Sequence, residues 1–322
     1  MWFCRSQPPE DEISLLRRAA ESFTEESDEK VTSEVLGKIT RLEGVDFATA
    51  LLFDRFQNSA AHSEFIRRMD SLRERSEANR PFHHAKLVIV PGALYRERPE
   101  MGGDGRIVLE VAKEFGWSTD FIPTSSFGSI QTNANLICEW MSKHSKEKII
   151  LVSLSKGSAD LKVALASIEA PRLFQNVAAW VNVCGPLDGS RMANWFLEHQ
   201  LLAAFVQFQC LVQRRDVQFV KQMQHGPKGL LAFSLPSPAS MRVFTLMGFP
   251  LKRHMSTPFS RFCHRILSAW GPNDGTTSLS DLRSWPGKIY PAWGMDHYFR
   301  PEAEARSLVR AMLHYLAEDT FK

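Results

Sequence analysis

Short runs of apolar residues alternate with helical segments between Lys86 and Cys184, and this alternation constrains the fold more than any other feature. The first run, Leu87-Val88-Ile89-Val90, is rich in β-branched residues and is stopped by Pro91-Gly92, as expected of a buried strand followed by a turn. Strands that alternate with helices form a parallel sheet covered on both faces. The sequence therefore predicts an α/β fold with strands at 87–90, 119–123, 149–153 and 177–184 and helices at 107–115, 129–143 and 156–168.

The segments on either side of this region have a different character. Residues 1–80 predict a helical extension, because apolar residues such as Ile13, Leu16 and Ala20 recur at three- and four-residue spacing. After Cys184 the alternation stops, and residues from about 190 to 264 hold apolar and aromatic stretches without a clear strand pattern. We expect a helical cap there, inserted into a main domain of residues 81–322 that resumes near 288–290 and ends in a helix at 302–317.

Composition and charge restrict the possible partners. The 322 residues are 44% hydrophobic and carry a formal net charge of +3, a balance that does not favour nucleic acid or a membrane surface. No apolar run reaches the roughly 20 residues that span a bilayer, and the first residues do not resemble a signal peptide, so a cytoplasmic protein is expected. Five cysteines without a CxxC pair predict buried free thiols, with one or two disulfides in a secreted enzyme as the alternative.

The strand at 149–153 ends in a turn that carries a candidate nucleophile. The stretch Val152-Ser153-Leu154-Ser155-Lys156-Gly157-Ser158 places Ser155 between small residues where a strand gives way to a helix. Such a turn strains the central residue, exposes its hydroxyl, and lets the helix N-terminus stabilise an oxyanion. A helix-capping role for Ser155 is the alternative interpretation.

Further residues complete a possible catalytic group. The turn after the first strand offers the Ala93 backbone N–H as an oxyanion donor, alongside that of Lys156. The turn Gly271-Pro272-Asn273-Asp274-Gly275 carries an acid, and a later loop carries His297, so the chain order is Ser, Asp, His. The alternative acids are Asp281 and Asp296, and the alternative bases are His254 and His264.

From about residue 86 to residue 322, these patterns resemble the α/β-hydrolase superfamily, and within it the bacterial lipase-like serine esterases. Ser155-Lys156-Gly157-Ser158-Ala159-Asp160 looks like their Ser-Lys-Gly-Gly-x-Asp nucleophile helix, and Asn273-Asp274-Gly275 looks like their acid loop. Residues 184–190 are similar to the turn that leads into their lid. The sequence departs from the family at Pro91, which replaces a usual His, at Ser153, which replaces the first elbow glycine, and at the polar pair Thr276-Thr277.

The resemblance implies hydrolysis of a carboxylic ester by a triad of Ser155, Asp274 and His297 through an acyl-enzyme. It implies neither a cofactor nor a metal ion, and the apolar segment at 190–264 favours a small-molecule ester with an apolar group. The oligomeric state is left open. Two alternatives stay open for the function, namely a non-catalytic binding protein with this fold and a hydrolase of thioesters or polyesters.

Overall fold

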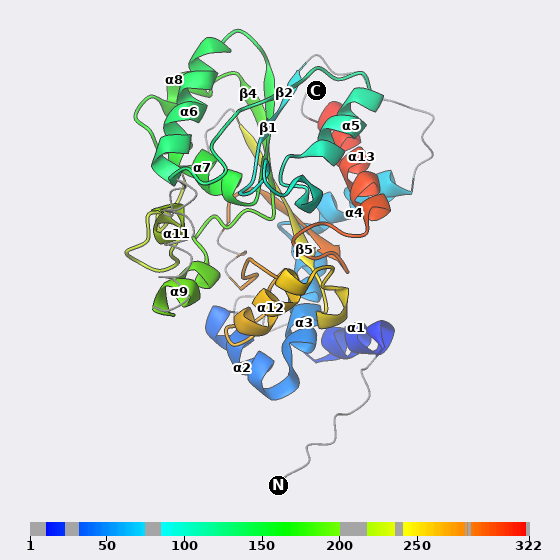
Figure 1. The fold of residues 1–322 in the computed structure, drawn as a ribbon. Coiled ribbons are helices and arrows are strands. Elements are labelled where there is room, and N and C mark those ends of the chain that lie inside the picture. Colours follow the sequence, from blue (N-terminus) through cyan, green and yellow to red (C-terminus); the bar gives the residue numbers. More distant parts are fainter. Residues whose placement is uncertain are drawn as a thin grey trace.

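A single six-stranded parallel sheet forms the centre of the protein in this computed structural model (Figure 1). The strand order is β2-β1-β3-β4-β5-β6. The structure describes residues 11–22, 32–74, 85–199, 218–235, 241–280, 282 and 285–319. The strands are β1 (Lys86–Val90), β2 (Thr119–Phe121), β3 (Ile149–Leu154), β4 (Val177–Val183), β5 (Arg242–Phe249) and β6 (Lys288–Trp293). The predicted parallel α/β sheet is confirmed.

Helices cover both faces of this sheet. On one face α6, α7 and α8 pack together, and on the other α13 packs against α4 and α5 (Figure 1). All six residues of β3 are buried, as expected for a strand with helices above and below it. The helices of the first half are α1 (Glu12–Glu21), α2 (Ser33–Glu43), α3 (Val45–Asn58), α4 (Ser63–Arg73), α5 (Arg106–Glu114) and α6 (Ile130–Lys143). The remaining helices are α7 (Lys156–Leu165), α8 (Ala170–Leu173), α9 (Arg191–Glu198), α11 (Gln218–Gln222), α12 (Pro258–Leu267) and α13 (Glu302–Asp319).

The described residues of the N-terminal segment form the helices α1 to α4, and α2, α3 and α4 contribute side chains to the main core. Phe65 of α4 packs on Phe244 of β5 and on Tyr315 of α13, with ring centroids 5.4 and 4.9 Å apart. The Tyr290 hydroxyl of β6 donates a 2.6 Å hydrogen bond to Asp70 of α4. The helices α3 and α4 therefore cover the β6 side of the sheet, and a boundary near residue 80 stays a prediction.

The prediction of a strand-free cap over residues 190–264 is wrong in its second half. Strand β5 lies between β4 and β6 in the sheet, and every residue of it except Arg242 is buried. A strand that is buried on both faces has no polar–apolar alternation, so its sequence resembles a buried helix. In the first half of the predicted cap, α9 and α11 are helical, and residues 200–217 lie outside the described part.

The structure bears in part on the predictions about the cysteines and about membrane-spanning segments. Cys138, Cys184 and Cys263 are free cysteines, whereas Cys4 and Cys210 lie outside the described residues. Within the described ranges no helix is both long and apolar enough to cross a membrane.

Candidate active site

Ser155 lies in a sharp turn between β3 and α7. Its backbone has φ 46° and ψ −120°, and its N–H donates to the Val183 carbonyl oxygen at 2.9 Å. The turn passes close to the end of β1, because a Cβ at Gly157 would lie 2.4 Å from the Pro91 carbonyl oxygen. Only glycine fits at that position, and the strained turn presents the Ser155 side chain beyond the carboxyl edge of the sheet. The Ser155 side chain makes no cap hydrogen bond to α7, in contrast to the capping interpretation.

Ser153 stands where the lipase-like pattern has glycine, and its hydroxyl has partners on both sides. It accepts a 2.7 Å hydrogen bond from the Trp180 indole N–H and lies 2.7 Å from the Ser158 hydroxyl. Because a buried hydroxyl is costly only when it lacks a hydrogen bond, the turn accommodates this departure from the pattern.

Three predicted residues form one hydrogen-bonded chain. The Ser155 Oγ lies 3.0 Å from His297 Nε2, and His297 Nδ1 lies 2.8 Å from Asp274 Oδ2. The Asp274 carboxylate is fully buried, and its Oδ1 accepts the backbone N–H groups of Thr276 and Thr277 at 2.8 and 2.6 Å. The carboxylate is thus fixed by the backbone of its own loop, so the polar side chains of Thr276 and Thr277 do not disturb it.

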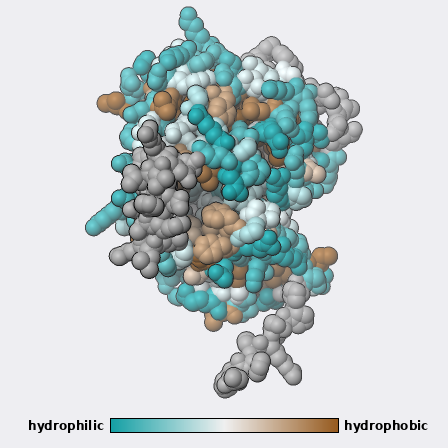
Figure 2. Space-filling model, viewed as in Figure 1, coloured by the Kyte–Doolittle hydropathy of each residue, from teal (hydrophilic) through white to brown (hydrophobic). Residues whose placement is uncertain are grey.

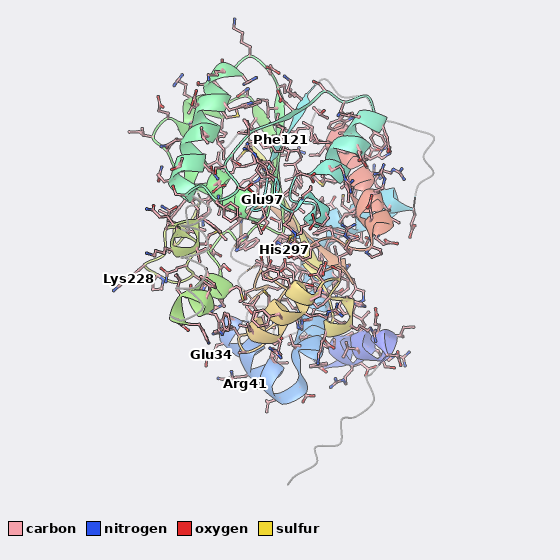
Figure 3. The ribbon with its side chains drawn as sticks, viewed as in Figure 1. Glu34, Arg41, Glu97, Phe121, Lys228 and His297 are labelled. Carbon is pink, nitrogen blue, oxygen red and sulfur yellow. The ribbon has the colours of Figure 1, made fainter. Side chains whose placement is uncertain are left out.

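Burial and charge act in opposite directions on His297. Burial lowers the pKa of the imidazole, but the adjacent Asp274 charge and hydrogen bond outweigh it, so the pKa is raised above its ordinary value. In the view of Figure 3 His297 lies near the middle, whereas Glu34 and Lys228 lie at the outline, and the His297 side chain is 9% exposed. The Asp274 carboxylate therefore stabilises the protonated form of a largely buried base.

Among the described residues, the rival acid Asp296 and the rival bases His254 and His264 do not take part in this hydrogen-bonded chain. Asp296 Oδ2 accepts from the Ser256 N–H and hydroxyl at 2.7 and 2.6 Å, and its other oxygen accepts the Tyr298 N–H. His254 Nε2 lies 2.9 Å from Glu12, and burial lowers the pKa of His264. Asp281 lies outside the described residues.

The two candidate oxyanion donors lie close to Ser155. Ala93 follows Gly92, where a Cβ would lie 3.4 Å from the Ser155 Cβ, and Lys156 is the first residue of α7. Both residues line the same cavity as Ser155 and His297. In the described part of the chain, neither backbone N–H has an acceptor, so both can donate to a bound oxygen atom.

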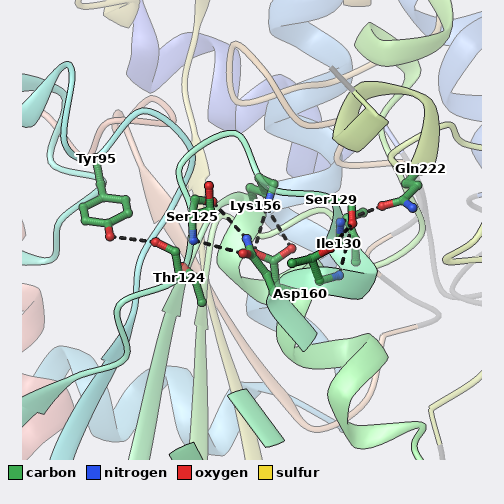
Figure 4. Close-up of polar contacts among 10 residues, drawn as sticks. Tyr95, Thr124, Ser125, Ser129, Ile130, Lys156, Asp160 and Gln222 are labelled. Carbon is green, nitrogen blue, oxygen red and sulfur yellow. Dashed lines mark hydrogen bonds and ion pairs between the residues drawn. The ribbon is translucent and has the colours of Figure 1, made fainter. Parts of the chain in front are cut away.

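The side chain of Lys156 forms a buried ion pair that the sequence did not reveal (Figure 4). Its Nζ donates to both Asp160 carboxylate oxygens at 2.9 Å, and Asp160 also accepts from Asn133 at 2.8 Å. Burial raises the pKa of Asp160 to about 6, against the opposing influence of Lys156. The four-residue spacing within α7 was a signal for this pair, because it places both side chains on one face of a helix.

An apolar cavity of about 660 Å³ opens beside the Ser155–His297 pair. Apolar residues gather around a hollow near the middle of the molecular face in Figure 2. The side chains that border the cavity beyond the turn include Phe127, Met192, Trp195, Phe196, Phe219 and Phe262. The helices α9, α11 and α12 thus line much of the cavity with apolar side chains, and these helices lie within or next to the apolar segment noted at 190–264.

One compact group of metal-ligating side chains occurs among the described residues, namely Cys184, Asp274 and His297, whose ligand atoms lie within 4.8 Å of one another. Burial and the nearby Asp274 charge raise the pKa of the Cys184 thiol, which disfavours the thiolate that binds metals. A metal ion here would also replace the hydrogen bond between Asp274 and His297. The residues therefore fit a hydrogen-bonded chain better than a metal site.

Comparison with solved structures identifies the fold of the chain. A metagenomic carboxyl esterase superposes with a TM-score of 0.54 at 21% identity, covering 76% of this chain and 81% of the esterase. The propeptide form of a lipase from Bacillus licheniformis gives a TM-score of 0.52 at 21% identity, covering 70% of this chain and 48% of the lipase. The chain has the α/β-hydrolase fold. No family model matches the sequence, and no curated protein matches it either.

Proposed function

We propose that this protein is a serine hydrolase that cleaves a carboxylic ester through Ser155, His297 and Asp274. The observation that carries the proposal is the continuous chain of 3.0 and 2.8 Å contacts from the Ser155 hydroxyl through the imidazole to a buried carboxylate. A serine is activated when a base accepts its proton and a third group orients that base. The α/β-hydrolase fold, which it shares with the carboxyl esterase and the lipase above, supports the same chemistry.

The reaction has two steps. Ser155 Oγ attacks the ester carbonyl while His297 Nε2 takes the hydroxyl proton and passes it to the departing alcohol, which leaves an acyl-Ser155 ester. Water then attacks the acyl group and loses a proton to His297, which passes this proton to Ser155 Oγ as the acid is released. Throughout, Asp274 holds the Nδ1–H tautomer of His297 and stabilises its protonated form.

The N–H groups of Ala93 and Lys156 are proposed to hold the carbonyl oxygen as it becomes negative. Both flank Ser155, and neither has an acceptor in the described structure. Loss of one such donor typically raises the barrier by about 3 kcal/mol. The apolar cavity beside them supports an apolar small-molecule ester as the substrate.

Labelling with a fluorophosphonate, followed by mass spectrometry of the modified peptide, tests the proposal. Such probes react with serines that a neighbouring base activates. We expect Ser155 to be labelled in the wild-type chain, and the label to be lost in His297→Ala but kept in His254→Ala, which removes a histidine outside the site. A folded protein without label on Ser155 would contradict the proposal. A panel of matched ester, thioester and amide substrates then determines the bond that is cleaved.

A further inference from the structure

Lys162 of α7 is a buried lysine that the proposed reaction does not use. Its side chain is 3% exposed, and its Nζ donates to the carbonyl oxygens of Leu187 at 2.7 Å and Leu231 at 2.8 Å. The Asp188 carboxylate, 3.5 Å away, is the third acceptor. Burial lowers the pKa of Lys162, against the opposing influence of Asp188. Because an ammonium has three N–H donors, these three oxygen atoms satisfy all of them.

The three acceptors of this ammonium bracket one segment of the chain. Leu187 and Asp188 come just before α9, and Leu231 follows α11. We define the cap elements as the described residues 190–199 and 218–230, which contain these two helices. None of the three acceptors lies in a described helix or strand. A single side chain of α7, the helix that begins directly after the candidate nucleophile, therefore holds the chain on both sides of the cap elements.

Hydrogen bonds join the two cap elements to each other. The Ser190 N–H donates to the Met223 carbonyl oxygen at 2.6 Å. The Asn194 side chain donates to the His225 carbonyl oxygen at 2.9 Å and accepts the His225 N–H at 2.8 Å. Because the cap elements are bonded in this way, contacts that fix their two ends also fix their common position.

Asp188 and Phe233 extend the contacts around the ammonium. The Asp188 carboxylate accepts a 2.6 Å hydrogen bond from the Trp285 indole N–H, and its carbonyl oxygen lies 2.9 Å from His225 Nδ1. The ammonium of Lys162 lies 4.6 Å from the centre of the Phe233 ring, within cation–π distance. The same point therefore joins α7, the loop before β6 and the chain that follows α11.

The cap elements supply part of the apolar lining beside Ser155. Trp195 of α9 and Phe219 of α11 border the same cavity as the nucleophile. A second contact holds α11 from the side of α6, because Gln222 accepts the Ile130 N–H at 2.6 Å (Figure 4). The distance from these aromatic side chains to Ser155 depends on where the cap elements lie, and hence on the residues that hold them.

We propose that Lys162 is a positioning residue that determines how well the site binds large apolar esters. An apolar side chain of the same length would fill the space on α7 without the cost of burying a charge, so the ammonium serves its oxygen partners rather than the packing of the core. Without it, the apolar lining is no longer held against Ser155, whereas His297 and Asp274 are held by other loops. The effect on substrates rests on the proposed function, but the effect on the cap elements does not.

One pair of identical substitutions tests the effect on substrates. Lys162→Met keeps the length of the side chain and removes its donors, and Lys143→Met makes the same change at a 65% exposed position of α6. The measured quantity is the ratio of kcat/KM for 2-naphthyl butyrate to that for p-nitrophenyl acetate. In Lys162→Met this ratio should fall by about fourfold for each methylene-sized contact that is lost, through KM rather than kcat. Lys143→Met should keep the wild-type ratio.

The same kinetics can contradict the assignment. An unchanged ratio in Lys162→Met, or a loss that appears in kcat alone, would overturn the positioning role and leave the hydrolase function intact. Lys162→Gln retains two uncharged N–H donors, so its ratio should lie between those of Lys162→Met and the wild type. This variant also repeats the test if Lys162→Met does not fold.

Hydrogen exchange, measured by mass spectrometry of peptides, separates positioning from general stability. In Lys162→Met, exchange should rise in the peptides that contain α9 and α11 and stay at the wild-type level in β3 and β4. An equal rise in the strands would mean general destabilisation and would overturn the inference. The measurement does not need activity. A rise confined to α9 and α11, in a chain whose Ser155 resists the fluorophosphonate, would uphold the role of Lys162 in holding the cap elements and reject the hydrolase.

Discussion

The strained backbone positions of the described residues cluster around the candidate site. Among the described residues, the non-glycine positions with positive φ are Leu94, Ser155, Cys184 and Phe299, and all of them line the cavity at the candidate site. Residues with a Cβ rarely adopt a positive φ, and they do so only where the surrounding structure enforces it. Such backbone strain is common at functional sites. The strain at Ser155 has a clear use, since it holds the hydroxyl within 3.0 Å of His297.

The choice between two buried acids is a prediction at the scale of single residues. Asp274→Asn keeps the shape of the site but no longer holds the Nδ1–H tautomer, so kcat should fall by about 10⁴. Asp296→Asn makes the same change in the carboxylate bonded to Ser256, and its loss of kcat should be far smaller. Steady-state kinetics on one ester substrate compares the two variants. A larger loss in Asp296→Asn would exchange the roles of the two acids.

The proposed role of His297 as the base predicts how activity depends on pH. The imidazole must be neutral to accept the Ser155 proton, and Asp274 raises its pKa above the ordinary 6.5. Activity should therefore disappear as the pH falls through a midpoint above 6.5, and be restored as the pH rises through it. A profile of kcat/KM against pH, with a substrate that does not ionise, measures this midpoint. An acid limb centred below 6.5 would mean that desolvation outweighs the Asp274 charge.

At the scale of elements, most of the sheet was predictable and one strand was not. Strands β1 and β3 were predictable because β-branched apolar runs end at recognisable turns. Ser155 and His297 became candidates because each follows the end of a strand, and Asp274 because it lies in a turn between them in the chain order Ser, Asp, His. Strand β5 was missed because its apolar residues show no alternation. Gly248 was a usable signal, since glycine inside a strand indicates a close backbone approach, and a Cβ there would lie 2.5 Å from the Met295 carbonyl oxygen.

The buried ion pair of α7 gives a prediction at the same scale. Asp160→Leu leaves the Lys156 ammonium buried without its partner, and removal of one member of such a pair costs about 3–5 kcal/mol of folding free energy. Lys156→Met combined with Asp160→Leu should recover most of that loss, and the backbone N–H of residue 156 stays in place. Urea unfolding of the two variants beside the wild type measures the difference. Equal destabilisation of the single and double variants would mean that the pair carries no buried charge.

At the scale of the whole molecule, the helices α3 and α4 belong to the same core as the site-bearing sheet. Arg73 of α4 donates to the Tyr290 hydroxyl at 2.9 Å and pairs with Glu304 of α13, so three elements meet there. Phe56, Phe65, Ile66, Met69 and Leu72 share one buried cluster with the strands. The segment before residue 80 was predicted as a helical extension that packs on the main domain, but its helical periodicity carries no information about which surface it covers.

Two leucine-to-alanine substitutions, one in α4 and one in α2, test whether the N-terminal helices and the sheet fold as one unit. Leu72 is 3% exposed within the shared cluster, so Leu72→Ala should lower the free energy of unfolding by about 2–5 kcal/mol. Leu42 in α2 is 81% exposed, so Leu42→Ala should change the free energy of unfolding by less than about 0.5 kcal/mol. Fluorophosphonate labelling of Ser155 across a urea series reports the integrity of the sheet itself rather than of the helices. If α3 and α4 folded as an independent unit, Leu72→Ala would leave the labelling midpoint of Ser155 where it is in the wild type. A shift to lower urea in Leu72→Ala alone would mean that the N-terminal helices and the candidate site fold together.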